Sequence, residues 1–138
     1  MKNAKVTLEY IFHPKVTIDA NQDFDPNLED DIPTEPEVAI HIGKLEDEST
    51  MQVIMTISLT AKESDPYSIE LTSVGRFIGN SELSKDEKVK AIIQSAPNIL
   101  YGAAREFILT ITCRSAYRDY VLTPKVFEPS DFIFPAAD

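Results

Sequence analysis

The segment from Met51 to Ala61 most restricts how this chain can fold, because apolar and other side chains alternate along it without interruption. One set of positions is entirely apolar: Met51, Val53, Met55, Ile57, Leu59 and Ala61. The other set is mainly polar: Gln52, Ile54, Thr56, Ser58 and Thr60. Successive side chains of a strand point to opposite faces of a sheet, so the pattern predicts a strand with one buried and one exposed face.

Three further segments alternate in the same way: residues 5–18, 38–42 and 67–72, the last ending at Gly75-Arg76-Phe77. The first is expected to carry one row of side chains on one face and a second row on the other: Val6, Leu8, Tyr10 and Phe12 opposite Lys5, Thr7, Glu9 and Ile11. Pro14 interrupts this strand, which is typical of a sheet edge or a bulge. Short connections between the later strands predict antiparallel neighbours.

Two helices are predicted after the strands. Ser84-Lys85-Asp86-Glu87 is a capping box that starts the first helix, which is expected to stop near Ala96-Pro97. A longer helix is predicted from Ala96 to Arg118, where apolar residues recur at three- and four-residue steps: Leu100, Ala104, Phe107, Ile108 and Ile111. Residues 107–112 are rich in β-branched side chains that favour a strand, but about twenty unbroken residues are too long for an ordinary strand.

The order of these segments predicts the fold class. Strands over about residues 5–77 precede helices over about residues 84–118, and an extended, proline-punctuated tail covers residues 120–138. This order is typical of an α+β fold, here a four-stranded antiparallel sheet with helices packed on one face. The 138 residues fit a single domain.

Composition restricts the compartment and the partners. The single cysteine, Cys113, cannot form a disulfide within the chain, and the sequence shows neither a signal peptide nor a long apolar run, so we expect a cytoplasmic protein. A formal net charge of −10 disfavours nucleic acid and anionic membranes as partners, since both need a cationic face. The acidity suits basic partners, or it only maintains solubility.

No catalytic, metal or cofactor site is predicted. The acidic segment Asn21–Glu37 lacks the glycine and final glutamate of an EF-hand loop, and we interpret it as a loop held by a few apolar side chains. The glycines are too scattered for a phosphate-binding loop. Cys113 has no base beside it in the sequence and is expected to be a buried structural thiol. The chain is therefore not expected to be an enzyme.

Two motifs resemble the SecB protein-export chaperones and their SecB-like relatives. The first is Ala-Pro-Asn-Ile-Leu-Tyr-Gly-Ala-Ala-Arg-Glu at residues 96–106, similar to the family's Pro-Asn-Ile/Val-Leu followed by Ala-Arg-Glu. The second runs from Glu70 to Gly75-Arg76-Phe77, similar to the end of the family's last strand. The segment Leu-Thr-Pro-Lys-Val-Phe at residues 122–127 is similar to an element that follows the family's long helix.

The resemblance implies a chaperone that binds unfolded preproteins without ATP and delivers them to the translocase motor SecA. It also implies a dimer of dimers assembled through the sheet and the long helix, with an interface expected to include Leu100, Ala103, Arg105 and Glu106. The motor would dock on the exposed face of the sheet, at Asp19, Glu70 and Ser68.

Some positions differ from the family pattern. Lys15 stands where better-known members carry an acid, and Ser68 where they carry leucine, which weakens the case for docking to SecA. The chain also has little room for the family's second, C-terminal helix, so a SecB-like chaperone for another client, such as an antitoxin, is an alternative.

Binding of many unfolded chains needs exposed apolar surface with flexible lining. We expect the client groove to be formed by apolar anchors of the acidic segment and the tail: Phe24, Leu28, Ile32, Phe127 and Phe132. Two other classes remain open. One is an oligomeric interaction module or a small-ligand-binding α+β domain, and the other is an enzyme that uses Cys113, which would need an accessible thiol of low pKa.

Overall fold

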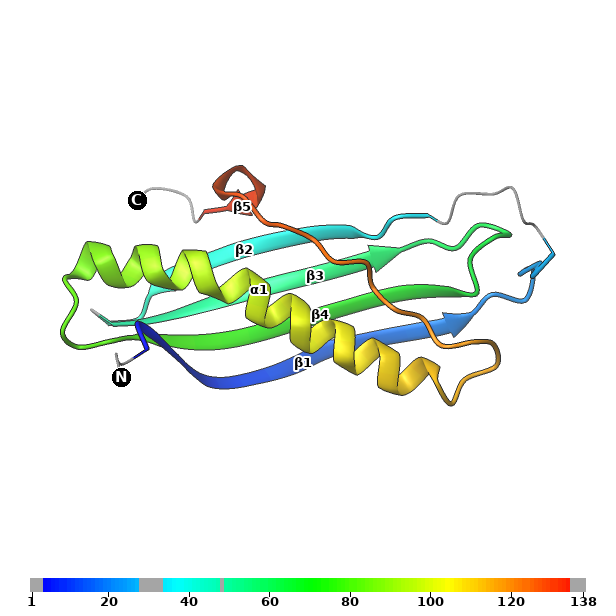
Figure 1. The fold of residues 1–138 in the computed structure, drawn as a ribbon, viewed down its shortest axis with the longest axis horizontal. Helices are drawn as coiled ribbons and strands as arrows, with labels where there is room; N and C mark the ends of the chain where they lie inside the picture. The colour runs from blue at the N-terminus through cyan, green and yellow to red at the C-terminus, as the bar shows by residue number, and fades with distance from the viewer. Residues whose placement is uncertain (1–3, 28–33, 48, 135–138) are drawn as a thin grey trace.

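The computed structural model describes residues 4–27, 34–47 and 49–134. Within these residues the helices and strands are β1 (Val6–Ala20), β2 (Glu37–Leu45), β3 (Thr50–Leu59), β4 (Tyr67–Gly79), α1 (Lys85–Thr112), the short 3-10 helix η1 (Pro129–Asp131) and β5 (Phe132–Ile133). The strands form one sheet in the order β1-β4-β3-β2-β5. Figure 1 shows α1 lying diagonally across one face of this sheet.

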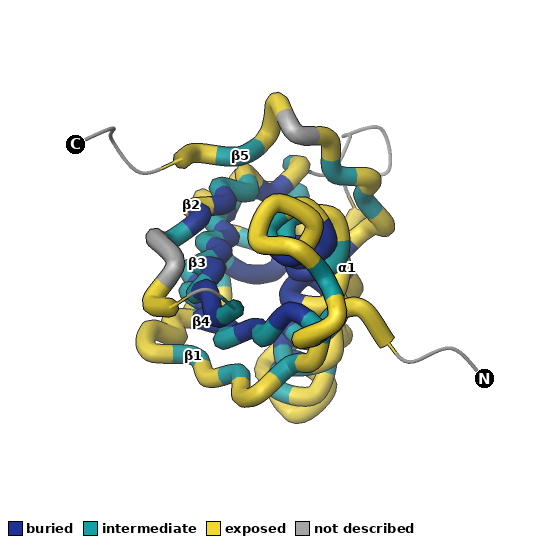
Figure 2. Tube along the Cα trace, turned by 90° about the vertical axis from the view of Figure 1, so that its left-hand side faces the viewer, coloured by how far each residue is buried: buried dark blue, intermediate teal, exposed yellow. Residues whose placement is uncertain are grey.

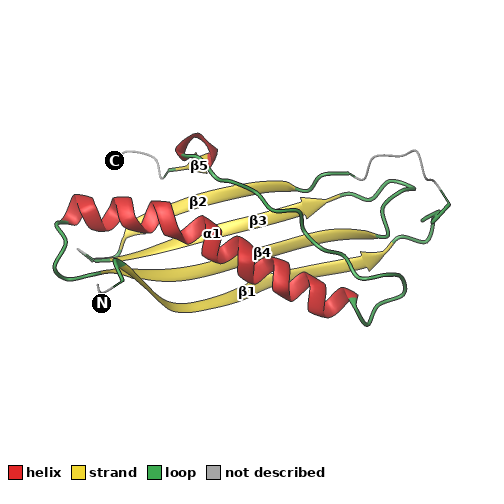
Figure 3. Ribbon diagram, viewed as in Figure 1, coloured by secondary structure: helices red, strands yellow, loops and turns green. Residues whose placement is uncertain are grey.

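The predicted α+β class is confirmed, and the strand count differs by one. The four long strands are antiparallel, as expected, whereas β5 is a two-residue strand that pairs in parallel with β2. A two-residue strand has no room for a period-two pattern, so the sequence carries no signal for it. The coloured ribbon in Figure 3 shows that the helix and the long segment after it lie on the same side of the sheet.

The core lies between α1 and the sheet face that it covers, as the burial colours in Figure 2 show. The alternation predicted for β3 is confirmed, since Val53, Met55 and Ile57 are fully buried while the residues between them are partly exposed. Ile92 and Leu100 of α1 are fully buried against this face. Each such side chain contributes about 1.5–3 kcal/mol by leaving water, which makes the helix–sheet layer the main stabilising contact.

The faces predicted for β1 are wrong beyond Leu8. The register shifts between Leu8, which pairs with Phe77, and Tyr10, which pairs with Arg76, so Glu9 is an extra residue in the strand. One inserted residue reverses the alternation that follows. Tyr10 and Phe12 therefore lie on the face away from α1, hereafter the outer face, where they are 38% and 45% exposed.

A second register shift falls between Phe12 and Lys15 and includes Pro14. Because β1 is also the edge strand of the sheet, Pro14 lies at an edge and at an irregularity, as its missing N–H predicts. After this shift, Ile18 pairs with Ile69 on the face toward α1, and Asp19 pairs with Ser68 on the outer face.

The predicted division into two helices is wrong, because α1 continues through Pro97. The cap is confirmed: the Ser84 hydroxyl accepts a hydrogen bond from the Glu87 N–H at 3.3 Å. Pro97 lies near the middle of α1, where Figure 1 shows the helix changing direction. A proline inside a helix costs about 3 kcal/mol, and burial of Ala96, Pro97 and Leu100 against the sheet offsets that cost.

The helix also ends earlier than predicted, at Thr112. The Thr112 hydroxyl donates to the carbonyl of Ile108 at 2.8 Å and accepts from the Tyr120 N–H at 2.8 Å, so it joins the last helical turn to the returning chain. Cys113 caps the helix and is exposed, which contradicts its expected burial. Its position one residue past the packed turn explains the difference.

The chain after α1 returns along the helix to the edge of β2, where β5 pairs with it (Figure 1). Leu122 is fully buried and fixes this segment to the core. Among the described residues, no helix is both long and apolar enough to span a membrane.

Candidate binding surfaces

The residues predicted to dock a partner lie together on the outer face. Asp19 pairs with Ser68 in the sheet register, and Thr17 pairs with Glu70, so the four side chains are neighbours at one end of β1 and β4. They line a shallow pocket of about 180 Å³. We call these four residues the acidic corner. They come together because paired residues of neighbouring strands point to the same face.

An ion pair alters the charge of this corner. The Lys15 Nζ lies 2.8 Å from the Glu70 Oε1, and both side chains are about half exposed. An exposed pair of this kind contributes little to stability, but it offsets the charge that Glu70 offers to a partner. The Ser68 hydroxyl accepts from the Ala61 N–H at 3.0 Å, which holds it in the sheet surface. Asp19 is exposed and supplies the corner's other carboxylate.

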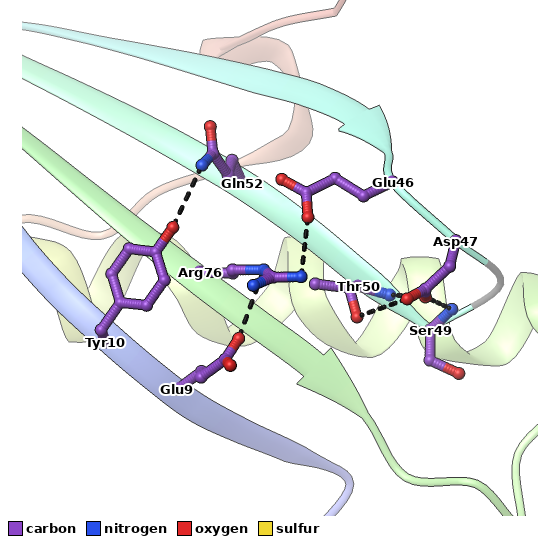
Figure 4. A network of polar contacts seen from close by, with 8 residues as sticks. All are labelled: Glu9, Tyr10, Glu46, Asp47, Ser49, Thr50, Gln52 and Arg76. Carbon is purple, nitrogen blue, oxygen red and sulfur yellow. Dashed lines mark hydrogen bonds and ion pairs between the residues drawn. The ribbon is translucent and has the colours of Figure 1, made fainter.

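The other end of the outer face carries a polar network, which Figure 4 shows, and beside it an aromatic pair. The Arg76 guanidinium bridges two carboxylates, with Nε 3.2 Å from Glu9 Oε2 and an Nη 2.8 Å from Glu46 Oε2. The Tyr10 ring stacks on the Phe12 ring with centroids 5.8 Å apart. This exposed aromatic pair was not predicted, since the bulge that exposes it has no signal in the alternation itself.

The predicted client groove is not brought together. The Phe24 ring packs on Tyr117 with centroids 5.0 Å apart, and the Arg118 guanidinium lies 5.7 Å from the Phe24 ring centre. Phe127 instead packs on Tyr101, with centroids 5.4 Å apart. The end of β1 and the short strand β5 lie well apart along the long axis of the molecule (Figure 1). Leu28 and Ile32 lie outside the described residues.

Phe127 and Phe132 do share a small pocket of about 110 Å³, which they line with three residues of α1: Ile93, Gln94 and Pro97. We call it the tail pocket. Phe132 pairs with Ile40 of β2, so its side chain points to the helix-covered face. Both rings are half-buried, so they are partly protected from water without belonging fully to the core.

A larger pocket, of about 450 Å³, was not predicted. Three segments far apart in the sequence line it: residues 34–36, 64–66 and 118–123. Asp65 is almost fully buried beside it and accepts hydrogen bonds from the N–H groups of Thr34 and Lys62, each at 3.0 Å. Burial, with the Asp65 carboxylate as a second cause, raises the pKa of Tyr120 to about 12. Tyr120 is therefore a neutral hydrogen-bonding group at physiological pH.

The residues predicted for an oligomer interface divide into two groups. Leu100 is fully buried in the chain's own core and has no surface to offer a partner. Ala103 is partly exposed, and Arg105 and Glu106 are exposed on the side of α1 away from the sheet. Gly102 lies beside them, and a Cβ atom added there would meet nothing within 4 Å. This side of the helix is therefore accessible.

The described residues contain no group of three or more acidic, histidine or cysteine side chains placed to hold a metal ion. The exposed Cys113 thiol donates to the Thr110 carbonyl at 3.0 Å, a contact within its own helix end.

No protein-family model matches the chain. It is 29% identical over 99 residues to the protein-export protein SecB of Psychrobacter arcticus, a match that covers 67% of this chain and 66% of that protein. It is also 29% identical over 100 residues to SecB of Dechloromonas aromatica, which covers 68% of this chain and 64% of that protein. The match thus spans slightly less than two thirds of the length of these curated relatives.

The fold is similar to that of the Mycobacterium tuberculosis Rv1957 SecB-like chaperone, solved in complex with a ChAD peptide from the Rv1956 HigA1 antitoxin. The TM-score is 0.64 at 16% identity, and the alignment covers 88% of this chain and 92% of that one. At this identity the match shows the fold alone. The resemblance found in the sequence motifs is therefore confirmed: the chain is similar to SecB proteins in sequence and to a SecB-like chaperone in fold.

Proposed function

We propose that the protein is a non-enzymatic holdase, which binds unfolded polypeptides without ATP and keeps them from aggregating. The observation that carries this proposal is the agreement of sequence and fold on one kind of relative, whose names describe protein export and chaperone activity. The prediction that the chain is not an enzyme agrees with these names. A cytoplasmic location is part of the proposal, because nascent chains are unfolded there.

The surfaces support a client-binding role. Half-exposed apolar side chains occur at Phe24, in the crossover that connects β1 to β2, and in the tail pocket. A large pocket opens beside residues 118–123. Partly exposed apolar surface next to many charges can hold a varied set of unfolded segments while the complex stays in solution. We assign clients to these surfaces as separate contacts, and we add the larger pocket to them.

Aggregation suppression tests the proposal directly. An unfolded precursor diluted into buffer without nucleotide should scatter less light when the protein is present at near-stoichiometric amounts. Phe24→Ser should weaken this protection, since it removes an aromatic contact at the crossover, whereas Val126→Ser, at an 89% exposed position, should not. Full aggregation in the presence of the folded wild-type protein would refute the holdase.

Delivery to the translocase motor SecA is the proposed next step, with the acidic corner as its docking surface. The Lys15–Glu70 ion pair reduces the charge of that corner, so Lys15→Glu should strengthen binding to purified SecA, and Asp19→Lys should abolish it. Isothermal titration calorimetry would measure both. A wild-type protein and a Lys15→Glu variant that both fail to bind would remove the motor from the proposal.

A second candidate partner is an antitoxin. The structural neighbour was solved with a peptide of an antitoxin, which makes an antitoxin segment a specific alternative client. Co-expression with candidate antitoxins would decide between the two, because only the true client should become soluble.

Assembly into a homo-oligomer, with a dimer of dimers as the expected form, is proposed through two surfaces. The outward edge of β1 pairs with no described strand, and the exposed side of α1 at Gly102, Ala103 and Glu106 is accessible. Light scattering coupled to gel filtration should give a mass above the 15.5 kDa monomer. Ala103→Arg should lower this mass, while Lys90→Glu nearer the start of α1 serves as the control. A wild-type monomer would refute the assembly.

A further inference from the structure

The segment of residues 123–134 is held to the rest of the chain as a bound peptide would be. It lies along α1 and ends at the outer edge of β2 (Figure 1). The Tyr101 hydroxyl donates to the Thr123 carbonyl, and the Lys125 Nζ donates to the Pro36 carbonyl at 3.2 Å. Separate side-chain contacts, rather than a continuous ladder, therefore hold most of its length.

Two aromatic rings anchor this segment in the tail pocket. Between Phe127 and Phe132 the chain makes a tight turn, in which the Glu128 N–H donates to Asp131 Oδ2 at 2.7 Å and the Asp131 N–H donates to the Glu128 carbonyl at 2.9 Å. The turn lets both rings line one pocket against α1. The pocket thus accepts aromatic side chains from an otherwise loosely held strand.

The last part of the segment pairs weakly with the sheet. Only Ile40 and His41 of the nine residues of β2 pair with β5, opposite Phe132 and Ile133. Ile133 and Phe134 remain 50% and 53% exposed. A pairing this short is marginal on its own, and the edge strand that it covers is a natural template for another extended chain.

We propose that the β2 edge and the tail pocket form a binding site for extended, aromatic-bearing segments of unfolded polypeptides, which residues 129–134 occupy as a self-ligand. A client segment displaces β5, runs parallel to β2 and places an aromatic or large apolar side chain where Phe132 lies. Strand addition supplies backbone hydrogen bonds to any sequence, and the pocket supplies the preference for aromatic residues. The inference deepens the proposed function and rests on it for the identity of the displacing ligand.

A peptide in trans tests the site without any client. The chain is ended at Glu128, which keeps buried Leu122 and the Phe127 anchor, and fluorescence anisotropy measures binding of a labelled peptide of residues 129–134. The shortened chain should bind it about tenfold more tightly than the full chain, since apparent affinity scales with the fraction of open sites. The peptide with Phe132→Ala should bind weakly, and the peptide with Phe134→Ala should bind normally.

Backbone pairing is tested with peptides N-methylated singly at Phe132 or Ile133. Neighbouring N–H groups of a strand point to opposite sides, so one of the two peptides should lose binding and the other should keep it. No binding of the unmodified peptide to the shortened chain, equal binding to both chains, or no effect of either methyl group would overturn the proposal.

Client affinity separates this inference from the proposed function. The shortened chain, and the full chain with Phe132→Ala, should each bind a labelled unfolded precursor about fivefold more tightly than the wild-type chain, because the competing self-ligand is weakened. Unchanged or weaker binding would show that residues 129–134 do not compete with clients and would refute the self-ligand. If no form binds the precursor, the holdase fails, and the peptide measurements still decide whether the edge site exists. Circular dichroism verifies that each variant is folded.

Discussion

Gly75 lies where a side chain of α1 packs closely on the sheet. A Cβ atom added there would lie 2.6 Å from the Phe77 Cε2 and 2.9 Å from the Leu100 Cδ2, both in fully buried side chains. Gly75→Ala should therefore lower the free energy of unfolding by about 1–3 kcal/mol through overpacking. Gly102→Ala, on the open side of α1, should raise it by up to about 1 kcal/mol through better helix propensity. Urea unfolding measures both; a neutral Gly75→Ala would show that the layers are not in close contact.

His13, also at the scale of a single residue, makes the free energy of unfolding depend on pH. Its Nδ1 lies 2.8 Å from the hydroxyl of buried Ser73, its ring packs on Phe107 with centroids 4.4 Å apart, and burial lowers the pKa of His13 below its ordinary value of 6.5. The unfolded chain thus takes up a proton at a pH where the folded chain does not. The free energy of unfolding should fall as the pH drops through this range.

The His13→Gln variant should lose less stability than wild type between about pH 7.5 and about pH 5.5, because the residue no longer titrates. Ser73→Ala should keep the wild-type slope, since it removes the hydrogen-bond partner but leaves the imidazole buried. Urea midpoints at both pH values give the comparison. Equal slopes for wild type and His13→Gln would contradict the assignment.

At the scale of elements, sequence periodicity gave the correct faces where one continuous buried layer covers the element. The alternation of β3 gave the correct faces because one uninterrupted layer buries Val53, Met55 and Ile57. The continuity of α1 could not be predicted, since Pro97 is a local stop signal and only the packing of both halves on one sheet overrides it. The pairing of Asp19 with Ser68 was not predicted, but it places both residues on the outer face, the face that the alternation had given as polar.

The tail shows the opposite case. Its prolines predict an extended chain, but they give no sign of the two-residue pairing of β5 with β2. That pairing depends on a contact between positions about ninety residues apart, for which no local pattern exists. The same reason explains the missed large pocket, which three distant segments enclose.

Thr112 connects the end of α1 to the returning chain. Thr112→Val should lower the free energy of unfolding by about 1–3 kcal/mol, because the Tyr120 N–H loses its acceptor while part-buried. Thr112→Ser should keep the bond. Thr110→Val is a matched control, since the Thr110 hydroxyl makes only an exposed bond to the Glu106 carbonyl. Hydrogen exchange of the Tyr120 N–H should become faster in Thr112→Val alone. Slow exchange in that variant would show that another group accepts the hydrogen bond of the Tyr120 N–H.

For the whole molecule, the formal net charge of −10 should govern how fast clients arrive. Unfolded precursors of positive net charge should associate faster than negative ones of equal length, and the difference should shrink between about 50 mM and about 500 mM salt as screening increases. Stopped-flow fluorescence with such a pair of precursors provides the measurement. Rates that do not depend on client charge would leave the acidity with a role in solubility only.

The bulge at Glu9, rather than the types of the residues, determines that Tyr10 and Phe12 lie on the outer face. If Glu9 paired with Arg76 in a regular ladder, Tyr10 and Phe12 would lie under the helix and Ile11 would face water, although every side chain would be the same. The one-residue bulge thus decides which surface of the strand each of these side chains joins. The pairing register of β1 therefore determines this surface as much as its composition does.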